Sequence, residues 1–151
     1  MGDRFIKGLI AGLAGGITMN LWNFFAFYVL KLTEHRLLDW ASVYSMGRPP
    51  HNLMETIFML IAQLSWSAFL GIIFVYLLPL ISLRFLLVKG LVFGYISGFI
   101  MWSIPTLFQT PFLISMTFGT VVSHAIESII FGLTLALAIQ WLELGIPKDK
   151  R

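Results

Sequence analysis

Two pairs of histidine and glutamate stand at spacings that put both side chains on one face of a helix. His51 and Glu55 are four residues apart, and His124 and Glu127 are three apart. Residues at these separations are neighbours on a helix surface. Imidazole and carboxylate groups from several helices of a bundle can hold a transition metal ion, and the same groups can relay protons. The set therefore predicts either metal binding or the handling of protons and ions.

A structural role is the third interpretation of these acids. Glu55 follows Asn52 by three residues, a spacing that predicts a capping box at a helix start. Glu127 is harder to explain as a cap, because its helix is expected to begin two or three turns earlier. An acid at that depth predicts a functional site with a partner. We expect ion or proton handling by Glu55, His124 and Glu127; a divalent metal held by His51, Glu55, His124 and Glu127 is the alternative.

Four long apolar runs must position these groups. The chain has 151 residues, of which 58% are apolar and 11% charged, whereas soluble domains carry roughly 25% charged residues. The runs cover residues 5–30, 53–78, 90–108 and 121–142, and each is long enough to cross about 30 Å of hydrocarbon as a helix. The pattern predicts an all-α polytopic membrane protein, a single integral membrane domain over residues 1–151 with four transmembrane helices.

The longest connection predicts a fifth, shorter helix over residues 36–46. Leu37, Leu38, Trp40, Ala41 and Tyr44 are near helical spacing, and Gly47 followed by two prolines ends the pattern. We expect this helix to lie at the outer membrane interface, anchored by Trp40 and Tyr44. A plain capped turn between two spans is the alternative.

The basic residues predict the orientation in the membrane. Of the ten Lys and Arg residues, seven fall on one side of the expected spans and three on the other. Cytoplasmic segments are enriched in Lys and Arg, so both termini are expected in the cytoplasm and the protein in the cell membrane. The basic excess then reports topology and contact with membrane lipid; no nucleic-acid partner is expected. The seven are Arg4, Lys7, Arg84, Lys89, Lys148, Lys150 and Arg151; the three are Lys31, Arg36 and Arg48.

Glycine recurs in two similar segments, "KGLIAGLAGG" (residues 7–16) and "KGLVFGYISG" (residues 89–98). Small residues at every fourth position let two helices approach closely in lipid. A second similarity, "NLMETIF" (52–58) with "HAIESII" (124–130), aligns Glu55 with Glu127. Together they predict two parallel two-helix repeats, with chance similarity among apolar residues as the alternative. The expected packing residues are Gly8, Gly12, Gly16, Asn20, Gly90, Gly94 and Gly98.

Two further lines of small and polar residues run along the second and fourth spans at intervals of four or eight residues. Such lines face protein or a cavity rather than lipid, and predict either a solute path or a packing seam. The second span carries Glu55, Gln63, Ser67 and Gly71, and the fourth carries His124, Ser128, Gly132, Ala136 and Gln140.

Three segments carry a resemblance to known proteins. They are "GLIAGLAGGITMN" near the start, "LLDWAS" followed by Gly-x-Pro-Pro, and "IIFGLTLAL" near the end. With these motifs the chain resembles small four-helix proteins of bacterial inner membranes. That resemblance implies a location and a fold, and it carries no activity.

Two classes of function fit these observations. The first is a small permease or channel-like component, an oligomer, with the Glu/His cluster on its outer side handling a small ion or solute. The second is a structural or accessory subunit that binds partner membrane helices through its glycine faces. The chain has no Cys, which excludes thiol chemistry and Cys-type zinc or iron–sulfur sites, so we expect neither an enzyme nor a resident cofactor.

Overall fold

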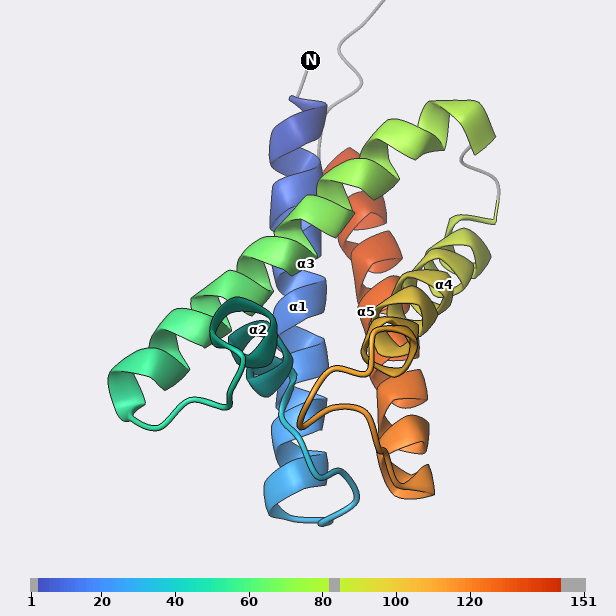
Figure 1. Ribbon diagram of the computed structural model, residues 1–151. Helices are drawn as coiled ribbons and strands as arrows, with labels where there is room; N and C mark the ends of the chain where they lie inside the picture. Colours follow the sequence, from blue (N-terminus) through green and yellow to red (C-terminus); the bar gives the residue numbers. More distant parts are fainter. Residues whose placement is uncertain (1–2, 82–84, 145–151) are drawn as a thin grey trace, which may run out of the picture.

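The computed structural model describes residues 3–81 and 85–144, and within them the chain is helical, with no strand. Five helices follow one another: α1 (Arg4–Tyr28), α2 (Leu37–Met46), α3 (Leu53–Ile81), α4 (Leu86–Leu107) and α5 (Phe118–Leu144). Four of them, α1, α3, α4 and α5, are long and apolar enough to cross a membrane. They alternate in direction, so the two ends of the described chain lie at the same end of the bundle (Figure 1).

The helix bounds differ from the predicted spans by a few residues. α4 begins at Leu86 rather than residue 90, because apolar residues precede Lys89 and lysine is a good helix former. α5 begins at Phe118 rather than residue 121. α1 ends at Tyr28, where the next two backbone N–H groups both donate to the carbonyl of Phe25, and the chain turns.

The long helices form two packed pairs that meet along one side. α1 packs on α3, α4 packs on α5, and α1 also packs on α5. α5 is the most enclosed span, with half of its apolar window buried, whereas 11% of the α4 window is buried. α3 and α4 meet near the end of α3 and the start of α4, where the ring centroids of Phe74 and Phe93 are 4.9 Å apart, and the two helices diverge toward their other ends (Figure 1).

Glycines allow the backbones within each pair to touch. A Cβ added at Gly12 would meet the backbone of Ser67 and Ala68 in α3, and one added at Gly94 would meet the backbone of Ser128 and Gly132 in α5. Backbone cannot yield as a flexible side chain can, so only glycine is accommodated at this separation. Both stripes are therefore occupied by helices of the same chain.

α2 is a helix, as predicted, but Trp40 does not anchor it to a membrane interface. The side chain of Trp40 is 6% exposed and packs with Val43 and the fully buried Leu113, from the loop that follows α4. An apolar ring gains more from burial against protein than from a position at the helix surface. Tyr44 is exposed and donates a hydrogen bond to the carbonyl of Met101 on α4 (3.3 Å).

Capping residues define both ends of α2: Arg36 and Asp39 at its start, and Gly47 at its end. The carboxylate of Asp39 accepts a hydrogen bond from the backbone N–H of Arg36 (2.7 Å) and pairs with its guanidinium (2.7 Å). Gly47, with φ of 70°, ends the helix in the left-handed conformation that glycine adopts without strain. The first N–H of α2, that of Leu37, donates to Oδ1 of Asn23 on α1 (2.9 Å). This bond ties α2 to the polar cluster described next.

Candidate functional site

Glu127 lies inside the helix bundle, as the sequence predicted. It stands nine residues after Phe118, the first residue of α5, which is roughly 13 Å along the helix axis. Its side chain is 2% exposed, and that of His124 is fully buried. Both therefore depend on protein partners, because a buried polar group without one is costly.

Three donors surround the carboxylate of Glu127. Oε1 accepts hydrogen bonds from Nδ2 of Asn23 on α1 (2.8 Å) and from Oγ of Ser123, one turn earlier on α5 (2.9 Å). Oε2 lies 2.8 Å from Nδ1 of His124. Asn and Ser can donate to a carboxylate in this way whatever the charge of the imidazole. The cluster thus joins α1, α5 and, through Asn23, the start of α2.

The contact with Glu127 sets the tautomer of His124. An ionised carboxylate only accepts hydrogen bonds, so Nδ1 of the imidazole carries the proton. Nε2 has no hydrogen-bond partner in the described part of the chain, whether or not it carries a second proton. Trp102 of α4 stacks on the imidazole with ring centroids 5.5 Å apart, and Trp40 of α2 meets it edge-on at 5.1 Å. The two indoles hold the ring in one orientation.

A cavity of about 490 Å³ lies beside this pair, between α3 and α4 and next to α2. Both His124 and Glu127 line it. Much of the remaining wall is aromatic or sulfur-containing, and the polar groups are an amide and hydroxyls. These residues are Met19, Trp40, Tyr44, Gln63, Trp66, Ser97, Met101, Trp102, Ser128 and Phe131. The volume lies in the range typical of small-molecule sites.

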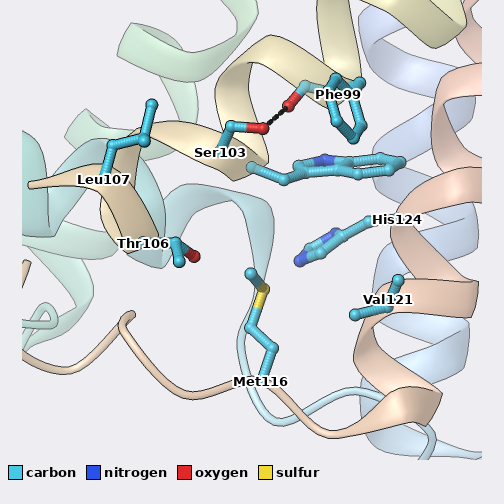
Figure 2. A pocket seen from close by; sticks show the side chains of 8 residues that line it. Phe99, Ser103, Thr106, Leu107, Met116, Val121 and His124 are labelled. Atoms are coloured by element: carbon cyan, nitrogen blue, oxygen red, sulfur yellow. Dashed lines mark hydrogen bonds between the residues drawn. The ribbon is translucent and has the colours of Figure 1, made fainter. Parts of the chain in front are cut away.

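A second cavity of about 310 Å³ lies on the other side of the imidazole. Figure 2 shows His124 reaching into it, toward Thr106 and Met116, with Val121 below and Phe99 above. His124 and Trp102 line both cavities, whereas Glu127 lines only the larger one. The imidazole therefore forms part of the partition between the two spaces.

Glu55 lies elsewhere and makes its contacts with other residues than Glu127, whose histidine partner is His124. Its carboxylate pairs with the guanidinium of Arg48 (2.9 and 3.1 Å) and accepts from the backbone N–H of His51 (2.9 Å). Its own backbone N–H donates to Oδ1 of Asn52 (2.8 Å), which is the capping interaction that the spacing predicted. The hydrogen bonds from Arg48 to this carboxylate raise the pKa of Arg48. Glu55 is thus an N-terminal residue of α3, stabilised by the helix dipole and a basic neighbour.

The four residues considered for a metal site are not brought together. His124 and Glu127 form one contact, and His51 and Glu55 another at the first turn of α3. Within residues 3–81 and 85–144, no three His, Asp or Glu side chains are grouped so that they could hold a metal ion. The proximity suggested by sequence similarity fails because the two segments occupy different depths in their helices.

Sequence reasoning missed four members of the site. Asn23 stood out only as an amide inside an apolar helix, and its partner on α5 is 104 positions away. Ser123 precedes Glu127 by four residues, a helical spacing that could have drawn attention to it. The two tryptophans beside His124 carry no local signal, because α2 and α4 reach the imidazole only in the folded chain.

Comparison of the chain with protein-family models, with curated proteins and with solved structures finds no match.

Proposed function

We propose that this protein is a small membrane permease or channel-like component that handles a small ion or solute at the buried pair of His124 and Glu127. The observation that carries the proposal is the position of this pair: two ionisable side chains, each at most 2% exposed, on the wall of a cavity of about 490 Å³ inside a bundle of membrane-length helices.

The cost of the pair favours a functional role. A charged side chain at the centre of a transmembrane helix costs about 3 kcal/mol on insertion scales, and such residues mark ion pathways and proton relays. Packing alone needs no carboxylate here, since an apolar residue would satisfy the helix contact more cheaply. The three donors around Glu127 instead hold the carboxylate in one position, as binding of an ion or a proton at this site requires.

A repeat that relates α1 and α3 to α4 and α5 would place the cavity between its two halves. The glycine contacts support a register in which Gly12 corresponds to Gly94 and Ser67 to Ser128, because each glycine approaches the carbonyl of the serine in its own pair. Glu55 and Glu127 are not equivalent in this register; Gln63 corresponds to His124. Several pairs of equivalent positions then line the cavity: Met19 with Met101, Gln63 with His124, Trp66 with Glu127, and Leu70 with Phe131.

The two helix pairs that such a repeat would relate to each other, α1 with α5 and α4 with α3, are packed differently. α1 packs directly on α5, with Thr18 donating to Thr134 across the contact (3.0 Å). The related side, between α3 and α4, holds the cavity. A repeat that is closed on one side and open on the other provides a binding space between its halves, the arrangement common in transporters built from internal repeats.

The distribution of basic residues also predicts which face of the membrane lies nearer to the pair. With both termini cytoplasmic, as the distribution of basic residues favours, the His124–Glu127 pair lies nearer the outer face of a bacterial inner membrane. Solute would then reach the pair from the side of α2 and the loop before α5.

Proton flux in liposomes tests this proposal. Purified protein is reconstituted with a pH-sensitive dye inside, and a potassium gradient with valinomycin sets the membrane potential. We expect proton entry above that of protein-free liposomes, and a loss of at least tenfold in Glu127→Gln. Glu34→Gln, which removes an exposed carboxylate, is the control. Liposomes that remain impermeable with the native protein, or equal flux in Glu127→Gln, would contradict the proposal.

An accessory subunit is the second candidate, and one observation favours it. α4 is 11% buried over its apolar window and leaves a large face for lipid or for a partner helix. Its glycines, however, already contact α5, so such a partner, or a second copy in a homo-oligomer, would have to bind another face. The same liposome measurement separates the two candidates, because an accessory subunit alone carries no flux.

A further inference from the structure

Among the described residues, the wall of the larger cavity carries one carboxylate, that of Glu127, and one imidazole, that of His124, and neither Lys nor Arg lines the space. The indole and phenol rings are those of Trp40, Tyr44, Trp66 and Trp102, and the phenyl ring of Phe131 adds to the wall. The faces of indole and phenol rings attract cations, most strongly where water is excluded. A carboxylate beside four such rings is complementary to a positive charge with an apolar body.

The negative charge of Glu127 has no permanent counter-ion. Its three partners are an amide, a hydroxyl and an imidazole, of which only the imidazole of His124 can become positive. A buried charge is stable when it is paired. The site is therefore neutral when His124 carries two protons, and it lacks one positive charge when His124 carries one.

The imidazole has an edge on each side of the partition. Nδ1 faces Glu127 at the larger cavity (2.8 Å), and the ring reaches into the smaller cavity, toward Thr106 and Met116 (Figure 2). Nε2 is fully buried and has no partner among the described residues. A buried nitrogen of this kind is expected to exchange its hydrogen bond or its proton with a molecule that the cavity admits.

We infer that the larger cavity binds a hydrophobic organic ammonium ion beside Glu127, and that its binding displaces one proton from His124 through Nε2 into the smaller cavity. The inference rests on the proposed function, for which it names the solute class. The exchange conserves charge: a carboxylate with a doubly protonated imidazole and a free ammonium ion becomes a carboxylate with a neutral imidazole and a bound ammonium ion, with one proton released.

Other occupants match the site less well. A lipid acyl chain would suit the apolar wall, yet it would leave the charge of the carboxylate without a permanent counter-ion and Nε2 without a hydrogen-bond partner. A metal ion would find two protein ligands, His124 and Glu127, where bound transition metals commonly have three or four. An ammonium ion satisfies the carboxylate by charge and the rings by contact.

The exchanged proton could be carried by His124, by Glu127 or by another titratable residue of the wall. The groups that face His124 from the other elements are neutral: Asn23 from α1 through Glu127, and Trp40 and Trp102 from α2 and α4. Of the other wall residues only Tyr44 titrates, and burial raises its pKa to about 12. Tyr44 therefore stays neutral over the physiological range, and the exchange falls to His124 and Glu127.

Calorimetric titration of the detergent-solubilised full chain tests the inference. The probe is benzyltrimethylammonium, with benzyl alcohol as the uncharged aromatic match. Titrations in two buffers of different ionisation enthalpy count the protons released. We expect binding of the cation only, about one proton released per cation, and an affinity that falls about tenfold per pH unit as the pair takes up its proton. Equal binding of benzyl alcohol, or no proton release, would overturn the inference.

Three variants sharpen the result. Glu127→Gln should weaken cation binding by at least tenfold, and Glu34→Gln should leave it unchanged. His124→Gln should retain binding but release no proton. Circular dichroism and gel filtration check that each variant folds, and the buffer comparison on the native protein does not depend on them. Cation binding by a protein that carries no proton flux would remove the permease proposal but keep this inference; Glu127-dependent flux without cation binding would do the reverse.

Discussion

At the scale of residues, the molecule separates two acids that look alike in the sequence. Both follow a polar residue at helical spacing, and both stand near a histidine. Glu55 lies at a helix start with the guanidinium of Arg48, in the setting where an acid is inexpensive. Glu127 lies among apolar helices, where only specific donors make it tolerable. Its environment, rather than its residue type, makes it the candidate for function.

The hydrogen bond from Ser123 to Glu127 provides a matched test. Ser123→Ala removes a buried donor to the carboxylate (2.9 Å), so we expect a loss of about 1.5 to 3 kcal/mol in the free energy of unfolding. Ser65→Ala makes the same substitution where the hydroxyl donates to a carbonyl of its own helix on the exposed face of α3, and should change stability by less than about 0.5 kcal/mol. Denaturant titration in mixed micelles measures both. Equal effects would show that Ser123 does not support the carboxylate.

At the scale of elements, glycine decides how closely the helices of each pair approach. α1 meets α3 and α4 meets α5 with backbone against backbone. α2 packs on α3 and makes three further contacts: with Asn23 of α1 through Leu37, with His124 of α5 through Trp40, and with Met101 of α4 through Tyr44. A short helix with ten residues would be marginal alone, so these contacts stabilise it.

Gly12→Leu tests the backbone contact of α1 with α3. The added side chain would overlap the backbone of Ser67 and Ala68, and we expect overpacking to cost about 1 to 3 kcal/mol. Ser65→Leu adds the same side chain on the exposed face of α3 and should be close to neutral. The melting temperatures of the two variants in detergent, followed by circular dichroism, make the comparison. If Gly12→Leu melts with the native protein, the close approach is not present.

At the scale of the whole molecule, the four long helices bring both ends of the described chain to one end of the bundle (Figure 1). The site residues Asn23, Trp102 and Glu127 belong to the opposite half, near the α2 end of α1, α4 and α5. If the basic residues set the orientation, this half is the outer one. Of those residues, Arg84, Lys148, Lys150 and Arg151 lie outside the described part of the chain.

Topology reporters test this arrangement. A fusion at Arg151 should report the cytoplasm, and one inserted after Met46, at the end of α2, should report the opposite side. We expect this orientation because Lys and Arg are in excess on the side of the predicted spans where the chain begins and ends. Alkaline phosphatase and green fluorescent protein fusions give opposite signals across the membrane. The same location for both sites would rule out four spans; exchanged locations would refute the orientation alone.

The sequence by itself determined the number and extent of the long helices, the short helix at residues 36–46 and the cap at Glu55. These features depend on local properties: apolar length, helical spacing and a capping pattern three residues long. It also singled out His124 and Glu127, because an acid among apolar residues is costly wherever its helix packs.

Only the tertiary structure decided what these residues face. Asn23 reaches Glu127 across 104 positions, and Trp40 and Trp102 come to His124 from separate helices. The similarity of "NLMETIF" to "HAIESII" suggested one shared site, yet Glu55 and Glu127 occupy different depths and different surroundings. Depth and neighbours depend on how one helix slides and turns against another. That register is set by glycine and serine contacts along the whole interface, which a seven-residue similarity does not contain.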